Sequence, residues 1–386
     1  MERFEIQPVL SSALPDVASF LRRWRDHQTE NWFDQYPIRE DPQSLERRLK
    51  WLLVENPAIP DGSQHGFCIR DHAGIIRGLT LSFPAAFLAG DRRLLGLCSG
   101  SFFVEPQART LGYFLFKKYL RSPGYSFFFA TTCNANSATL WRKMGGSAVP
   151  SSEREHILPL RLDVMLPAFV AGRTASEAAP EIARIIGRCA NPFLHRLARQ
   201  STQLTIEPCQ DWQKLSELFR RHRSAEWLTS DRSAEFLQWR YGPASPNYPC
   251  DIFVLRDKRG NEGWFSLSNI IRGNQGQIRG SVLLDAIWPR EKMGFRDILP
   301  EILRLVASGA DAIFFRPQPG LDYGECSRWI IPYRSEAPRA FVITRKVDPL
   351  LPVTSLDYDD SDYGAWAVHW PGPGGRSDLP NRSRAA

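Results

Sequence analysis

An internal repeat constrains the fold of this chain more than any other feature of its sequence. The segment around Trp51, LKWLLVENPAIPDGSQHGFCIRDHAGIIRGLTLSF, resembles the segment around Trp239, FLQWRYGPASPNYPCDIFVLRDKRGNEGWFSLS. Both patterns predict a helix that ends in a tryptophan and a proline-rich turn, then a strand that closes in Arg-Asp, a turn with a glycine, and a second strand. A repeat of this length indicates two copies of one supersecondary unit.

The similarity continues in the same order beyond these strands. An apolar stretch that ends at Pro106 parallels one that ends at Pro289, and each is followed by a helical pattern and another strand. The offset between matched positions falls from 188 residues at the two tryptophans to 183 at the two prolines, as small deletions would produce. The chain has 386 residues, more than one domain of average size, so we predict two tandem α/β units.

The repeat and the composition between and after its copies divide the chain. We predict an N-terminal unit at 1–162, a helical linker at 163–200, a C-terminal unit at 201–370 and a disordered tail at 371–386. Three isoleucines of the linker are expected to pack against one of the units rather than on a membrane surface: Ile182, Ile185 and Ile186.

The composition excludes several classes of protein. With 43% apolar and 24% charged residues the chain is globular, and no apolar run is long enough to cross a bilayer. Because the N-terminus also lacks a signal-peptide pattern, we expect a cytoplasmic protein. The seven cysteines show no C-x-x-C and no metal-ligand spacing, which favours buried thiols and no metal. The net charge is +7, but the arginines are scattered, so nucleic acid is not expected as a partner.

One stretch, LCSGSFFVEPQARTLGYFLFKKYL, predicts a site. It reads as an apolar strand that ends at Val104, a proline, a short loop and a helix. The free N–H groups and the positive dipole end at the start of such a helix suit a pyrophosphate. Gly112 would let the backbone approach a phosphate closely, and Arg109 would supply positive charge. This loop is therefore a predicted anion-binding site.

The order of Val104, Pro106, Arg109 and Gly112, V-x-P-x-x-R-x-x-G, resembles the acyl-CoA binding motif of the GNAT N-acyltransferase superfamily. The downstream stretch FFFATTCNANSATLWRKMGG is similar to the next element of that family. Its matching residues are Asn134, Trp141, Lys143, Met144 and Gly145. The resemblance covers the N-terminal unit, and the repeat extends it to the second unit.

The resemblance implies a fold and a cofactor. Each unit would be a mixed, mostly antiparallel central sheet flanked by helices, splayed between its fourth and fifth strands, with the pantetheine arm of acetyl-CoA or another acyl-CoA in the gap. No metal would take part. Strand-edge groups would pair with pantetheine, loop N–H groups would hold the pyrophosphate, and an asparagine would lie near the cofactor arm. The implied cofactor-binding residues are Phe103, Val104, Arg109, Thr110, Leu111, Gly112, Tyr113 and Asn134.

The sequence departs from the family pattern in both units. Phe114 replaces a small residue at the start of the helix, and Trp141 stands where the family commonly has a tyrosine proposed as general acid. An indole N–H does not donate a proton at neutral pH. In the second unit the glycine comes five residues after the proline, at Gly294, and Glu291 brings negative charge nearby. We therefore expect the first unit to bind acyl-CoA and the second to complete the acceptor site or to serve structure.

Two carboxylates are candidate general bases. Glu105 stands at the end of the motif strand, and Asp285 lies inside the strand LLDAIW of the second unit, where an ionisable group is unusual. A structural interpretation stands beside each: a solvated strand end for Glu105, and a bond to an arginine or to backbone for Asp285. Cys133 has no histidine to activate it and is expected to be a buried thiol.

Together these patterns predict an acyl-CoA-dependent N-acyltransferase, with acetyl-CoA as the expected donor. The acceptor would be an amine of a small molecule, an amino sugar or a lipid precursor. Two alternatives stay open: a non-catalytic GNAT-fold scaffold or binding protein, and an aminoacyl-tRNA-dependent transferase.

Overall fold

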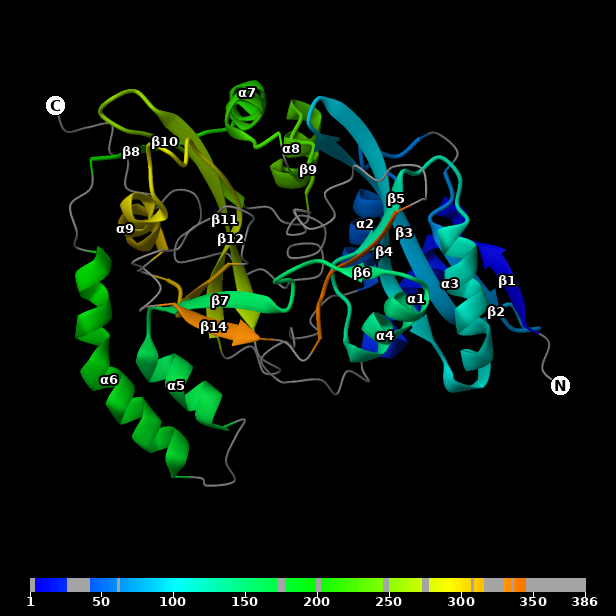
Figure 1. Ribbon diagram of the computed structural model, residues 1–386. Coiled ribbons are helices and arrows are strands. Elements are labelled where there is room, and N and C mark those ends of the chain that lie inside the picture. Colours follow the sequence, from blue (N-terminus) through cyan, green and yellow to red (C-terminus); the bar gives the residue numbers. More distant parts are fainter. Residues whose placement is uncertain are drawn as a thin grey trace.

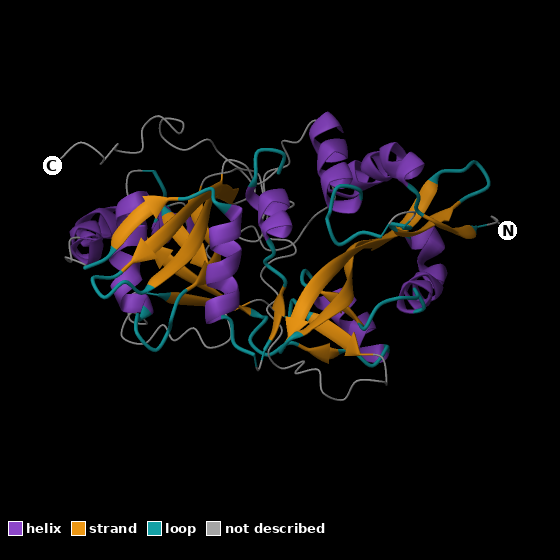
Figure 2. Cartoon of the chain, turned by 90° about the horizontal axis from the view of Figure 1, so that it is seen from above, coloured by secondary structure: helices purple, strands orange, loops and turns teal. Residues whose placement is uncertain are grey.

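The computed structural model describes residues 4–25, 42–60, 63–171, 178–198, 203–225, 227–245, 250–272, 278–306, 309–315, 330–334 and 337–344. The strands form two sheets that lie beside each other, and each sheet carries helices on its faces (Figures 1 and 2). The predicted disordered tail at 371–386 lies outside the described residues.

The first sheet has the order β1-β2-β3-β4-β5-β15-β6, and β9 pairs with β3. Its neighbours are antiparallel except β4 and β5, which are parallel. The strands are β1 (Glu5–Pro8), β2 (Gly66–Arg70), β3 (Ile76–Ala89), β4 (Arg92–Val104), β5 (Phe127–Ala130), β6 (Ser147–Ala148), β9 (Leu228–Ser230) and β15 (Phe341–Thr344).

The second sheet has the order β14-β7-β13-β12-β11-β10-β8, again with one parallel pair, β12 and β13. Its strands are β7 (Arg154–Pro159), β8 (Thr205–Pro208), β10 (Cys250–Arg256), β11 (Glu262–Arg272), β12 (Ile278–Ile287), β13 (Ala312–Phe315) and β14 (Ile331–Arg334). The position of the parallel pair is therefore the same in both sheets, as the repeat predicts.

Apolar clusters lie on both faces of each sheet. Helices α1 and α2 cover one face of the first sheet, and α3 and α4 cover the other. Helices α7 and α8 lie on one face of the second sheet and α9 on the other. The helices are α1 (Leu14–Arg25), α2 (Pro42–Leu53), α3 (Gly112–Leu120), α4 (Ala135–Lys143), α5 (Leu162–Ala171), α6 (Ala179–Ala198), α7 (Trp212–His222), α8 (Ala234–Tyr241) and α9 (Phe295–Val306), with 3-10 turns η1 (Ser11–Ala13) and η3 (Pro106–Leu111).

Each half of the chain contributes to the sheet of the other half, and the C-terminal half contributes the short strand β9 beside β3 as well as a strand next to the parallel pair. Strand β7 of the N-terminal half pairs with β13 and β14, and β15 of the C-terminal half pairs with β5 and β6 (Figure 1, green β7 beside orange β14). The two exchanged strands hold equivalent positions in their sheets. The predicted units 1–162 and 201–370 therefore do not coincide with the two sheets. A strand pattern indicates which residues are buried but does not identify the neighbouring strand.

The two tryptophans that anchor the sequence repeat meet each other. The rings of Trp51 and Trp239 stack with centroids 4.3 Å apart and an interplanar angle of 10°. Each indole N–H donates to the backbone carbonyl of the other residue, at 3.0 and 3.1 Å. This reciprocal contact indicates that the two units are related by an approximate two-fold axis.

The predicted linker forms the helices α5 and α6, which pack on each other. Gly187 of α6 lies so close to α5 that a Cβ atom there would be 2.4 Å from the Leu162 carbonyl oxygen, and the Asn191 side chain accepts from the Leu162 N–H at 2.7 Å. Because this small and polar face of α6 points inward, its apolar face is exposed. The prediction that the three isoleucines pack against a unit is therefore wrong: Ile182, Ile185 and Ile186 are 57%, 61% and 57% exposed.

The six cysteines in the described part of the chain form no disulfide, and Cys209 among them is partly exposed. Four are buried (Cys68, Cys98, Cys133 and Cys250), whereas Cys189 on α6 is exposed, so the prediction of buried thiols is wrong for Cys189. Within the described ranges no group of three or more His, Cys, Asp or Glu side chains could hold a metal ion. None of the helices described there is both long and apolar enough to span a membrane.

Candidate functional site

The first sheet opens between β4 and β5. The two strands pair in parallel only where 96–98 faces 127–129, although β4 continues to Val104. On its other side β4 stays paired with β3 as far as Val104 and Gly78. The backbone of 99–104 therefore presents an edge toward a gap between the two strands, at the place where the predicted residues Phe103 and Val104 lie.

A β-bulge bends β4 at the start of this gap. One residue of β3, between Leu79 and Leu81, lies opposite two residues of β4, between Gly100 and Phe103. Ser101 within this bulge has φ of 50°, which is unusual for a residue other than glycine. A bulge adds local twist and bends its strand, and this bulge lies just beyond Cys98, the last residue of β4 that pairs with β5.

The predicted anion-binding loop follows the bent strand directly. η3 occupies the loop, and α3 begins at Gly112, whose N–H donates to the Arg109 carbonyl. Gly112 has an ordinary helical φ of −58°. A Cβ atom there would lie 3.4 Å from the Val104 side chain and 3.7 Å from Phe102, in ordinary contact. A larger side chain at this position would therefore enter the space between the helix start and the open strand.

The cofactor-binding residues predicted within the loop form one continuous strand end, turn and helix start. Arg109, Thr110 and Tyr113 are exposed, Leu111 is partly exposed, and Gly112 is buried. Phe114, whose bulk departs from the family pattern, is 54% exposed and lies outward from this helix. The side chains around the loop thus leave its outer surface open to a ligand.

Tyr119, which the sequence analysis did not single out, joins the two strands at the closed end of the gap. This fully buried residue of α3 places its hydroxyl 2.6 Å from the Leu97 carbonyl oxygen of β4 and 3.2 Å from the Phe129 carbonyl oxygen of β5. Burial raises the pKa of Tyr119 well above its usual value, so the phenol remains a neutral donor. The signal in the sequence was a tyrosine on the apolar face of a predicted helix, because a buried tyrosine hydroxyl normally has a hydrogen-bond partner.

The two downstream motif residues have different surroundings. Asn134 follows β5 and is exposed, and its side-chain oxygen accepts from the Ser137 N–H at 3.0 Å, which caps the start of α4. Trp141 is 2% exposed, and its ring lies edge-on to Phe116 at 5.0 Å. Trp141 is therefore a core residue at the position where the family commonly has a tyrosine.

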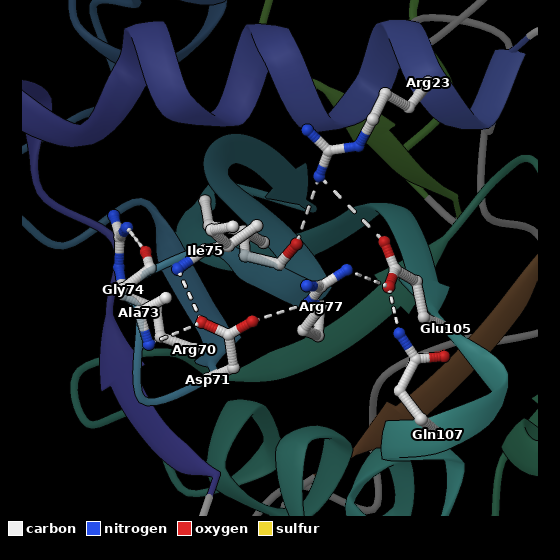
Figure 3. A network of polar contacts seen from close by, with 10 residues as sticks. Arg23, Arg70, Asp71, Ala73, Gly74, Ile75, Arg77, Glu105 and Gln107 are labelled. Carbon is white, nitrogen blue, oxygen red and sulfur yellow. Dashed lines mark hydrogen bonds and ion pairs between the residues drawn. The ribbon is translucent and has the colours of Figure 1, made fainter. Parts of the chain in front are cut away.

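Glu105 is surrounded by arginines (Figure 3). Its carboxylate accepts from the Arg77 guanidinium at 3.1 Å and from Gln107, and it lies 3.9 Å from Arg23. Arg77 also bonds Asp71 at 2.8 Å, and this hydrogen bond holds the pKa of Asp71 below its usual value. As a general base Glu105 remains a prediction, and its carboxylate is already bonded to the Arg77 guanidinium.

Asp285 is 2% exposed and pairs with one buried arginine. Its two oxygens accept from Arg232 at 2.7 and 3.1 Å, and the Tyr241 hydroxyl lies at 3.4 Å. The structural interpretation of this residue, a carboxylate bonded to an arginine, is confirmed. Asp285 and Glu105 lie in different sheets, on β12 and at the end of β4, so they are not parts of one carboxylate pair.

The second sheet opens in the same way as the first. Strands β12 and β13 pair only where 280–282 faces 312–314, and a bulge follows in β12 opposite Ser266 and Leu267. The loop differs, because α9 begins at Phe295, after Gly294, and no 3-10 helix precedes it. The second unit thus repeats the open strand but not the loop.

Solved structures share this arrangement. An Enterococcus faecalis protein described as a probable N-acyltransferase superposes with a TM-score of 0.50 over 89% of this chain and 73% of its own, at 9% identity. A GCN5-related N-acetyltransferase from Anabaena variabilis gives 0.51 over 88% and 72%, at 12% identity. Saccharomyces cerevisiae N-myristoyltransferase, solved with bound myristoyl-CoA, gives 0.52 over 89% and 78%, at 12% identity. The chain has the GNAT fold. The sequence itself matches no protein-family model and no curated protein.

In this fold the two halves of the chain share strands between their sheets, which two independent α/β domains would not do. Each superposition covers nearly nine-tenths of the chain, so the likeness extends over both halves of the chain.

Proposed function

We propose that the protein is an acyltransferase that moves an acyl group from acyl-CoA to an amine, with acetyl-CoA as the first donor to test. The observation that carries this proposal is the open edge of β4 at 99–104, followed without interruption by the loop at 105–112. The structural neighbours include a probable N-acyltransferase and an N-myristoyltransferase with bound myristoyl-CoA, which supports the same class of donor.

The donor would lie along the first unit. Pantetheine amides would pair with the backbone edge near Phe103 and Val104, as an added strand would. The pyrophosphate would lie at the start of α3, near the backbone of Arg109 to Tyr113, where the helix dipole favours negative charge. Asn134, beyond the end of the neighbouring strand β5, would border the cofactor arm.

The chemistry requires little from the protein. The amine nitrogen attacks the thioester carbonyl carbon, the carbon–sulfur bond breaks, CoA leaves as a thiolate, and the amine loses a proton. Holding the two reactants together supplies much of the acceleration, and strand-edge N–H groups would stabilise the oxyanion. The thiolate is a good leaving group, so a core tryptophan in place of a tyrosine does not prevent the reaction. We place the acceptor between the first unit and the second.

The test is acceptor-dependent release of free thiol. Purified full-length protein is mixed with acetyl-CoA and, in turn, a polyamine, glucosamine and an amino-lipid precursor in detergent. The proposal expects thiol release that depends on one of these acceptors and on protein concentration. Tight binding of acyl-CoA without release for any acceptor class would contradict it.

One observation favours the non-catalytic alternative. The Gly112 N–H, a predicted phosphate donor, already donates to the Arg109 carbonyl. If the backbone N–H groups of this loop stay bonded within the 3-10 helix, they do not bind a phosphate. The protein would then be a scaffold and not an acyl-CoA-binding enzyme. The same thiol-release assay, together with a titration of acyl-CoA, separates the two functions.

A further inference from the structure

A cavity of about 580 Å³ lies beside the open strand of the second unit. The end of α7, strand β9, the end of β12 and the loop that follows β12 line it. It is distinct from the loop of the first unit. Strand β9 pairs with β3 at 87–89, whereas the first-unit loop follows Val104, which pairs with Gly78 near the other end of β3. About ten residues of strand, roughly 30 Å, separate these two places.

The lining of the cavity is cationic. Five arginine or lysine side chains line it against two carboxylates, Asp285 and Glu291. Asp285 and Arg232 are paired with each other at 2.7 Å, so the rest of the described lining holds four cations and one anion. One of these cations, Arg223, also lies 3.5 Å from Asp91 outside the cavity. These four cations are Arg221, Arg223, Arg290 and Lys292. Burial is the main cause that lowers the pKa of His222 at the same cavity, and the nearby Arg221 and Lys292 lower it further.

Three polar atoms bordering the cavity have no hydrogen-bond partner among the described residues. They are His222 Nε2, Arg223 Nη1 and Thr229 Oγ1. Thr229 is 6% exposed, and such a hydroxyl normally has a partner because leaving it without one costs stability. A rotation about a side-chain bond would turn the hydroxyl or the guanidinium toward the cavity, where a ligand oxygen would satisfy it.

We propose that this cavity is a second ligand site, which binds a phosphate group at the place where the second unit repeats the open strand of the first. Arginine and lysine side chains around a partly enclosed space are the usual phosphate ligands, and Trp227, with Arg290 5.1 Å above its ring, offers a flat surface beside them. The phosphate would belong either to a phosphorylated acceptor or to the nucleotide part of a coenzyme. The site does not depend on acyl transfer.

The test is calorimetric titration with sodium pyrophosphate at low ionic strength. The full-length protein and its Gly112→Glu variant are both titrated, because the variant removes binding at the first-unit loop. We expect saturable binding in both. Lys292→Gln should weaken it about tenfold, because Lys292 lines the cavity. Lys258→Gln, an equal charge change at the exposed turn between β10 and β11, should leave the affinity unchanged.

A second variant keeps the test independent of folding. Thr229→Val removes a hydroxyl that has no partner in the unliganded protein, so it should weaken pyrophosphate binding several-fold without lowering the melting temperature. Absence of saturable binding, or an affinity that neither variant changes, would overturn the proposal.

Coenzyme A distinguishes the two sources of the phosphate. In the Gly112→Glu background, displacement of pyrophosphate by coenzyme A would assign the cavity to a nucleotide, whereas displacement by glucosamine 6-phosphate alone would assign it to a phosphorylated acceptor. Either result supports a second phosphate site. If Gly112→Glu loses acyl-CoA binding but still binds pyrophosphate, the two ligands occupy different sites. The phosphate site can then be tested independently of the proposed function.

Discussion

At the scale of single residues, the best-preserved part of the repeat makes turns rather than chemistry. Asp71 accepts from the backbone N–H groups of Ala73 and Ile75, and Asp257 accepts in the same way from Arg259 and Asn261. The glycines of the two turns, Gly74 and Gly260, have φ of 78° and 81°. A residue with a Cβ atom would be strained at these values. The Arg-Asp similarity therefore marks equivalent hairpins and not a duplicated active site.

Tyr119 provides a residue-scale prediction. Tyr119→Phe removes the hydroxyl that bonds carbonyl oxygens of both β4 and β5, so it should lower the free energy of unfolding by about 1–2 kcal/mol. Urea denaturation of the variant and of the parent protein measures this difference. Tyr113→Phe, on the exposed start of the same helix, is the control and should change stability by less than about 0.5 kcal/mol. Equal effects of the two variants would show that the hydroxyl of Tyr119 does not hold the strands.

At the scale of elements, the exchanged strand β7 is fixed by a buried ion pair. Glu155 of β7 accepts from Arg272 of β11 at 2.7 and 2.9 Å, and the two side chains are 2% and 1% exposed. The Arg272 guanidinium lies 4.3 Å above the ring of Phe314. This contact joins the N-terminal half of the chain to a sheet built mainly from the C-terminal half.

Glu155→Ala should lower the free energy of unfolding by about 3–5 kcal/mol, because Arg272 would keep its buried charge without this carboxylate. Chemical denaturation measures the loss. Glu181→Ala, which removes a surface pair with Arg184 on α6, is the control and should cost under about 1 kcal/mol. If Glu155→Ala costs no more than Glu181→Ala, the ion pair does not secure the exchanged strand.

The contrast between β4 and β7 shows what the sequence could predict. An apolar run, a proline and a glycine close together in the sequence predict the strand that ends at Val104, the loop after it and the helix that follows. The structure confirms these elements as β4, its loop and α3. The partners of β7 depend on contacts with residues about 150 positions away, which no local pattern encodes. The cationic cavity was missed for the same reason, because its residues come from four separate elements.

At the scale of the whole molecule, strand exchange should make the two halves interdependent. A chain divided between α5 and α6, within 172–177, gives an N-terminal fragment that contains β7 of the second sheet and a C-terminal fragment that contains β9 and β15 of the first. We expect the two fragments to copurify through a tag on one of them when they are expressed together, and neither to unfold cooperatively when expressed alone. A single fragment that is monomeric and shows a sharp thermal transition would contradict this expectation.

The pH dependence of stability follows from the buried His65 and the partly buried His156 and His222. Burial lowers the pKa values of His65, His156 and His222 in the folded protein. The unfolded chain, with histidine pKa values of about 6.5, therefore binds more protons as the pH falls through that value. We expect urea midpoints to decrease from pH 7.5 to pH 5.5, and His65→Gln to reduce the decrease. Midpoints that stay constant or increase over this range would contradict the assignment.

A separate loss of stability is expected at lower pH. Hydrogen bonds from Arg161 and Arg256 lower the pKa values of Asp163 and Glu262, respectively. The stability that these carboxylates contribute is complete above their usual pKa values of about 4 and is lost only as the pH falls further. The two windows can be separated by measuring midpoints at pH 5.5 and at pH 3.5.

The most direct measurement is calorimetric titration of the full-length protein with acetyl-CoA and with a longer acyl-CoA, repeated on Gly112→Glu. The side chain of Gly112→Glu would place bulk and negative charge between the start of α3 and the open strand, while the helical φ of −58° accepts any residue. Lys118→Gln, the same charge change at the exposed far end of α3, is the control. We predict that the parent and the control bind acyl-CoA and that Gly112→Glu does not, although its circular dichroism spectrum is unchanged. Absence of binding in the parent, or undiminished binding in Gly112→Glu, would contradict it.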